Sequence, residues 1–145
     1  MERVTAALPA GFDALRAEAR RDGHRMLDTL AAEWERGTQR FVRPGEQLLI
    51  ALVGDVLAGI GGVTLEPAIP GALRMRRFYV ALAHRRAGVG RALATTLLDH
   101  AAGRAVTANA AAGSEAFWEA LGFARDRRDG RTHIRLASMV RHGRA

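Results

Sequence analysis

The sequence contains no cysteine and no lysine, and only 6% of its residues are aromatic. Without cysteine the chain forms no disulfide, and both thiolate chemistry and structural zinc are disfavoured. The five histidines are scattered along the chain, and no two of them have the spacing of zinc ligands. We therefore expect no metal site.

Long apolar runs are also lacking. Arg, Asp or Gly interrupts every apolar stretch, so we expect no segment that spans a bilayer and no membrane partner. The first residues lack the apolar core of a secretory signal, and this, with the absence of cysteine, predicts a cytoplasmic protein. A length of 145 residues predicts one domain over residues 1–145 with one site.

The charge is strongly basic. All 22 basic residues are arginine, against 15 acidic residues, which gives a net charge of +7. Such a charge favours an anionic partner, which a nucleic acid, a membrane surface or a phosphorylated small molecule can supply. The arginines are spread along the whole chain and aromatic residues are few, so nucleic-acid binding is the less favoured interpretation.

The hydrophobic pattern predicts an α/β protein. Apolar residues at helical spacing predict helices over 12–20 and 26–36, the second ended by Gly37. Two apolar runs around Gly54 and Asp55 predict a β-hairpin. Its strands cover residues 47–53 and 56–65; further helices are expected over 91–102 and 115–121, and further strands over 73–82, 105–108, 123–125 and 132–137, with a polar turn at 126–130.

The strand expected over 73–82 changes phase. Leu73 and Met75 alternate in one phase, whereas the apolar residues from Phe78 onward alternate in the other. An extra residue at Arg76 or Arg77 would return both groups to one face, which is the sequence trace of a β-bulge. A regular strand that is buried on both faces is the alternative.

A glycine-containing loop lies between this strand and the next helix, and residues 85–91 read Arg-Arg-Ala-Gly-Val-Gly-Arg. Gly88 and Gly90 lack the Cβ atoms that would hold a phosphate away from the backbone. The unpaired amides and the dipole of a helix start attract anions, and the arginines add formal charge. This pattern predicts a phosphate-binding loop, with a plain turn as the alternative.

With these residues the chain resembles the GNAT superfamily of acetyl-CoA-dependent N-acetyltransferases, whose pyrophosphate loop reads Gln/Arg-x-x-Gly-x-Gly/Ala after a bulged strand. Residues 77–80 look like the family's fourth strand, residues 105–109 like its fifth, and residues 117–123 like its signature after the following helix. The resemblance implies one N-acetyltransferase domain with a mixed, mostly antiparallel sheet. Helices flank this sheet, which is splayed between the fourth and fifth strands.

The resemblance also implies how acetyl-CoA is bound. Strand backbone would pair with the pantetheine arm, loop amides would hold the pyrophosphate, and the thioester would enter near Asn109. The implied cofactor-binding residues are Phe78, Tyr79, Val80, Arg85, Arg86, Ala87, Gly88, Val89, Gly90, Arg91, Asn109 and Trp118.

The family reaction is direct attack of a primary amine, on a small molecule or a peptide, on the thioester carbonyl. A tyrosine that acts as general acid in many relatives is replaced here by Trp118, whose indole has no acidic proton near neutral pH. The catalytic residues therefore stay unassigned. The candidates are His133 and Tyr79. His133 is chosen because a free imidazole has a pKa near neutrality, and Tyr79 because it is the only tyrosine. A structural role is the alternative for each.

Arginines replace the carboxylate that some relatives carry on the fourth strand. The hypothesis is that Arg74 and Arg76 pair with an acidic group of the acceptor, and the alternative is that both face solvent. The missing tyrosine and the absence of an obvious base leave a non-catalytic acyl-CoA-binding module as an alternative function. The arginine content leaves a basic nucleic-acid-binding protein as a second, less favoured one. The resemblance also allows a homodimer, because many relatives dimerise.

Overall fold

The structure is a computed structural model and describes residues 1–137. Seven strands form one sheet in the order β1-β2-β3-β4-β5-β7-β6, in which β4 and β5 are parallel and the other neighbours are antiparallel. The elements are β1 (Glu2–Arg3), α1 (Phe12–Arg21), α2 (Met26–Arg36), β2 (Gln47–Val53), β3 (Val56–Leu65), β4 (Leu73–Val80), the 3₁₀ turn η1 (Leu82–His84), α3 (Val89–His100), β5 (Val106–Ala108), α4 (Glu115–Ala120), β6 (Ala124–Arg128) and β7 (Arg131–Arg135). This arrangement confirms the predicted α/β class with a mixed, mostly antiparallel sheet.

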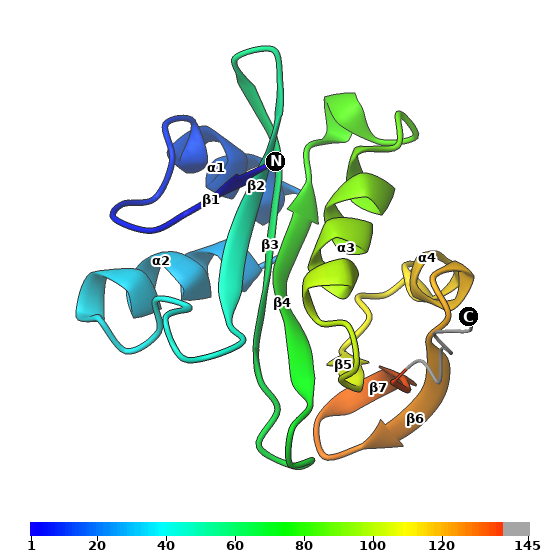
Figure 1. Ribbon diagram of the computed structural model, residues 1–145. Coiled ribbons are helices and arrows are strands. Elements are labelled where there is room, and N and C mark those ends of the chain that lie inside the picture. Colours follow the sequence, from blue (N-terminus) through cyan, green and yellow to red (C-terminus); the bar gives the residue numbers. More distant parts are fainter. Residues whose placement is uncertain (138–145) are drawn as a thin grey trace, which may run out of the picture.

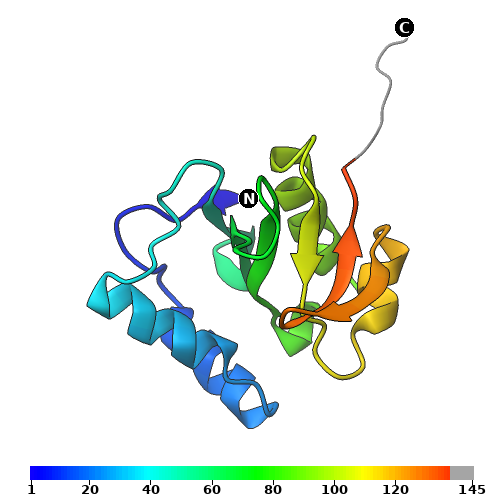
Figure 2. The ribbon, with the colours of Figure 1, turned by 90° about the horizontal axis from the view of Figure 1, so that it is seen from below.

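Helices cover both faces of the sheet. α1 and α2 pack on one face of its N-terminal part, and α3 packs on the opposite face, with α4 further toward the C-terminal strands (Figure 1, Figure 2). Two apolar cores result, and the sheet separates them. Leu30 and Ile60 are fully buried in the core beneath α1 and α2, and Val63 and Leu97 are fully buried in the core beneath α3.

The predicted bulge is present in β4. Ile60 of β3 pairs with Tyr79, and Gly62 pairs with Arg76, so that Gly61 faces two residues of β4. Arg77 takes the extra position with a φ of 55°. The bulge returns Phe78 to the α3 side together with Leu73 and Met75, so the alternative of a regular strand is wrong.

The sheet opens between β4 and β5. Their pairing is limited to Leu73 with Val106 and Arg74 with Thr107, after which β5 continues beside β7. From Met75 to Val80, β4 has no strand partner on that side among the described residues. The predicted splay is therefore confirmed, and its closed end is held by Glu66, which accepts hydrogen bonds from Arg74 and Thr107.

The structure adds one strand and shifts several predicted boundaries. α3 covers Val89–His100 instead of 91–102, and β7 ends at Arg135 instead of residue 137. β1 was not expected because its two residues are polar and exposed, and it is held by backbone pairing with β2. β4 ends at Val80, and Leu82 lies in η1 with 51% of its surface exposed. β6 continues to Arg128, so the expected turn at 126–130 is shorter, and ion pairs of Arg131 with Asp126 and Asp129 support the hairpin.

Gly62 allows β2 and β3 to lie close to Phe41. A Cβ atom at this position would lie 2.7 Å from Cε2 of Phe41 and 2.8 Å from the carbonyl oxygen of Gln47. We expect Gly62→Ala to lower the free energy of unfolding by about 1–3 kcal/mol, because the Gln47 carbonyl belongs to the sheet backbone and has little freedom to move. Urea denaturation measures this change.

The control for this prediction is Val56→Ala, on the same strand, where the side chain is 57% exposed. Its effect should stay within about 0.5 kcal/mol. Equal stability of Gly62→Ala and the wild type would show that β2 and Phe41 yield to the added methyl group.

Candidate active site

A cleft of about 890 Å³ lies where β4 and β5 separate. Its walls come from β4, the loop and first turn of α3, the segment 108–114 after β5, α4, and the turn between α1 and α2. The cleft contains every residue predicted to bind the cofactor except Ala87 and Val89, which belong to the same loop. The splay of the sheet thus brings the strand, loop and helix motifs to one place.

The glycine loop presents free backbone amides to this cleft. α3 begins at Val89, Gly88 is its N-cap with a φ of 82°, and no side chain caps the helix. Within the described chain, the amides of residues 86–91 donate no backbone hydrogen bond. Together with the dipole of a twelve-residue helix, these amides form an anion-binding site.

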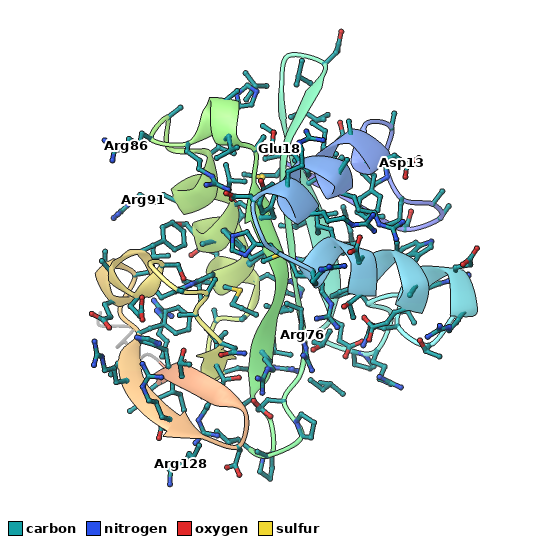
Figure 3. All side chains as sticks on the ribbon, turned by 180° about the vertical axis from the view of Figure 1, so that it is seen from behind. Asp13, Glu18, Arg76, Arg86, Arg91 and Arg128 are labelled. Carbon is teal, nitrogen blue, oxygen red and sulfur yellow. The ribbon has the colours of Figure 1, made fainter. Side chains whose placement is uncertain are left out.

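Three arginines lie at the loop: one is held by an ion pair and two are exposed. The guanidinium of Arg85 donates to the carbonyl of Val80 at 3.0 Å and pairs with Asp22 at 3.0 Å, which fastens the loop to β4 and α1. Arg86 and Arg91 are exposed beside the start of α3 and point outward (Figure 3). These two side chains therefore supply exposed positive charge beside the loop.

The two loop glycines are required for different reasons. Gly88 has a positive φ, and a Cβ atom there would meet no heavy atom within 4 Å. At Gly90 a Cβ atom would lie 3.3 Å from Val80 and 3.4 Å from Phe117, so this glycine lets the helix start approach β4 and α4. From the sequence, only the approach of a phosphate was expected to require these glycines; the packing of the helix start at Gly90 was not.

Aromatic side chains form the inner wall of the cleft. Trp118 packs edge-on against Phe78, Phe117 and Phe123, with ring centroids 5.0, 4.9 and 5.4 Å apart. Trp118 is buried, and Phe78 and Phe117 are partly buried. The ring faces of Phe78 and Trp118, both predicted site residues, give this wall an apolar surface.

Tyr79 is tied to α1. Its hydroxyl donates a 2.7 Å hydrogen bond to Glu18, whose same oxygen accepts from the amide of Leu82 at 3.0 Å. The guanidinium of Arg85 lies 5.2 Å from the Tyr79 ring centroid. Burial, followed by the hydrogen bond and charge of Glu18, raises the pKa of Tyr79 above the usual tyrosine range. The hydroxyl is thus protonated and already donating to Glu18.

His133, the other catalytic candidate, lies outside the lining of the cleft. It is fully buried in β7, with its ring nitrogens 2.8 Å from the Thr132 hydroxyl and 2.8 Å from a Glu119 carboxylate oxygen. The hydrogen bond with His133 lowers the pKa of Glu119. These contacts join β7 to α4, which is the work of a structural histidine.

The strand arginines differ in their partners. Arg74 pairs with Glu66 at 3.2 Å and donates to the carbonyls of Asp129 and Gly130. Arg76 donates through Nε to the Thr64 hydroxyl at 3.2 Å. Both arginines line the cleft, but the contacts of Arg74 connect β4 to the β6–β7 turn.

Sequence reasoning did not identify His24, which lines the cleft from the turn between α1 and α2. Its Nε2 lies 3.5 Å from a carboxylate oxygen of Asp22, and its ring centroid is 6.1 Å from that of Tyr79. Gly23, with a φ of 85°, marks the turn in the sequence, but nothing local shows that this turn meets β4. Met26 and the segment 110–114 also line the cleft and were not predicted, because no local sequence pattern shows which segments meet β4.

Residues 1–137 contain no cluster of three or more His, Cys, Asp or Glu side chains that could hold a metal ion. In the same range, no helix has the length and hydrophobicity needed to cross a membrane.

Comparisons with known proteins agree with this geometry. The family model of an acetyltransferase (GNAT) domain matches residues 15–141. A search of curated proteins finds no match.

Solved structures of low sequence identity share the fold. A candidate acetyltransferase from Exiguobacterium sp. 255-15 has a TM-score of 0.82 at 21% identity, covering 92% of this chain and 89% of that one. Ribosomal-protein-alanine N-acetyltransferase from Brucella melitensis has a TM-score of 0.60 at 20% identity, covering 92% and 95%. The Bacillus subtilis N-acetyltransferase YlbP, solved with coenzyme A, has a TM-score of 0.60 at 15% identity, covering 92% and 94%.

The single tyrosine makes the Tyr79–Glu18 contact directly measurable. We expect the tyrosinate absorbance to stay low at pH values where an exposed tyrosine, with a pKa of about 10, is ionised. Above about pH 10 the unfolded chain releases a proton that the folded chain keeps, so the free energy of unfolding should fall as the pH rises. Spectrophotometric titration and denaturation at several pH values measure both effects.

Glu18→Gln should lower the pKa of Tyr79 and weaken this pH dependence, because it removes the negative charge beside the hydroxyl. Asp13→Asn, on an exposed part of the same helix, should change neither (Figure 3). Ordinary titration of Tyr79 near pH 10 in the wild type would contradict the buried hydrogen bond.

Proposed function

The chain belongs to the GNAT acetyltransferase family, and we propose that it transfers the acetyl group of acetyl-CoA to a primary amine of a small molecule or peptide. One observation carries this proposal. The free amides at the start of α3 and the unpaired edge of β4 border the same cleft. An extended arm that bears amides and ends in a pyrophosphate matches both features.

The residues of the cleft suit each part of acetyl-CoA. Amides of residues 86–91 would bind the pyrophosphate, with added charge from Arg86 and Arg91. Backbone groups of residues 78–80 would pair with the pantetheine arm in the manner of an added strand. The thioester would then lie between the bulge of β4 and Asn109, against the apolar wall formed by Phe78 and Trp118.

The acceptor amine must lose a proton before or during its attack. His24 is the histidine that lines the cleft within the described chain, and its Nε2 lies 3.5 Å from the Asp22 carboxylate oxygen that also pairs with Arg85. Imidazole is the side chain best suited to accept a proton near neutral pH. We assign His24 the role of proton acceptor. The leaving thiolate is weakly basic, and water in the open cleft can protonate it without a tyrosine at position 118.

The glycine loop provides the first test. We expect Gly88→Asp to weaken acetyl-CoA binding at least about tenfold, because a carboxylate at the anion site repels the pyrophosphate and the φ of 82° strains the new residue. Isothermal titration calorimetry measures the dissociation constant.

Gly103→Asp is the matched control. Gly103 lies just after the other end of α3, has a φ of 85°, and also has no heavy atom within 4 Å of its added Cβ. The control should therefore carry the same backbone strain and keep full affinity. Equal affinity of the two variants, or no binding by the folded wild type, would contradict the assigned cofactor site.

His24 provides the second test. We expect His24→Gln to lower kcat by about 10- to 100-fold, because the amine then loses its proton acceptor. The dissociation constant for acetyl-CoA should remain unchanged. In the variant the rate should depend on pH only through ionisation of the amine itself.

His100→Gln, an exposed site at the C-terminal end of α3, should retain full activity. An unchanged kcat and pH profile in His24→Gln would exclude His24 as proton acceptor. Binding of acetyl-CoA by the wild type without thiol release in the presence of any amine would favour the acyl-CoA-binding module instead.

A further inference from the structure

β4 carries three arginines along the cleft, and their charges are balanced unequally. Arg74 pairs with Glu66 at 3.2 Å, and Arg77 pairs with Glu33 at 2.9 Å. Arg76 lies between them and contacts only the neutral hydroxyl of Thr64, through Nε. In the part of the chain that the structure describes, no ion pair involves Arg76.

The surroundings of Arg76 are unfavourable for an unpaired cation. The side chain is half-buried, and burial, followed by the charges of Arg74 and Arg77, lowers its pKa. Partial removal from water costs free energy that a paired anion offsets. The terminal nitrogens of the guanidinium, which Thr64 leaves free, form a planar fork that matches a carboxylate.

The place of Arg76 in the cleft separates it from the cofactor residues. On β4 and in the following loop, the cofactor residues come after the bulge, from Phe78 to Arg91, whereas Arg76 precedes it. Figure 3 shows Arg76 on the α2 side of the sheet, far from Arg86 and Arg91 at the phosphate loop. His24 and Met26 line the cleft from the turn between α1 and α2 and the start of α2. An anion at Arg76 would therefore belong to the acceptor.

We propose that Arg76 binds a carboxylate of the acceptor, so that the acceptor is a compact amine of the amino-acid type. This inference rests on the proposed acetyl transfer. Arg76 and Phe78 flank the bulge residue Arg77, so an acceptor held by its carboxylate at Arg76 lies beside the place proposed for the thioester, which favours a small amino acid. Arg74 has a positioning role, because its charge is paired and its contacts hold the β6–β7 turn. The sequence hypothesis named both Arg74 and Arg76 as ligands of the acceptor, and the present proposal keeps only Arg76.

The test compares each common amino acid with its own carboxamide as acceptor, with spermidine as a cationic amine. Thiol release from acetyl-CoA gives kcat/KM for each. For the preferred side chain we expect the free acid to exceed the carboxamide at least about tenfold. Spermidine should be poor, because it has no carboxylate and its positive charges meet the guanidinium of Arg76.

Substitution then assigns the preference to one residue. Arg76→Gln should abolish the ratio of acid to carboxamide, mainly through KM, and leave acetyl-CoA affinity unchanged. Arg76→Lys should keep part of the ratio, because it keeps the charge and loses the planar fork. Arg128→Gln, at an exposed arginine that does not line the cleft, should behave as the wild type (Figure 3).

A binding measurement separates this inference from the proposed function. Calorimetric titration of the same acids and carboxamides into the complex with coenzyme A needs no turnover. Binding of an acid that is lost in Arg76→Gln would support the carboxylate site even without transfer. Absence of acetyl-CoA binding would overturn the proposed function. With acetyl-CoA bound, equal use or equal binding of acids and carboxamides, or binding of neither, would overturn the role of Arg76.

Discussion

The early end of backbone pairing between β4 and β5 is the constraint on which the rest of the site depends. Two residue pairs join these parallel strands, and β5 then continues beside β7. Glu66 holds the closed end through Arg74 and Thr107, and it is almost fully buried there. Hydrogen bonds hold the two strands together at one end, and beyond that end the bulge at Arg77 changes the direction of β4. The opening therefore follows from the hydrogen bonding and the bulge of the sheet itself.

The opening makes two different kinds of binding surface available in one cleft. One side offers backbone groups and the positive end of a helix, which bind through fixed dipoles. The other side offers side chains from β4 and the turn between α1 and α2, which bind through shape and formal charge. A ligand bound by backbone groups places weak demands on side-chain identity, whereas a ligand bound by the other wall depends on a few side chains, of which Arg76 is our proposed example.

Arginine serves several purposes in this protein. Arg77 and Arg85 are neutralised by acidic partners 44 and 63 positions away, and Arg74 by Glu66, 8 positions away. These ion pairs hold elements together. Arg86 and Arg91 remain exposed beside the phosphate loop. The net charge of +7 therefore says little about function by itself, because the partners of each guanidinium decide whether it stabilises the fold or binds a ligand.

Local patterns were enough to predict the hairpin, the helices, the bulge and the glycine loop, because periodicity and turn chemistry act over a few residues. The bulge was visible as a phase change between Met75 and Phe78, and the splay was implied by family resemblance. Tertiary structure alone decided that His24 faces the cleft and that Tyr79 donates to Glu18. It also decided that Glu33 pairs with Arg77, while no acidic side chain within residues 1–137 pairs with Arg76. These contacts join residues 44 and 61 positions apart, and only packing of α1 and α2 against β4 brings them together.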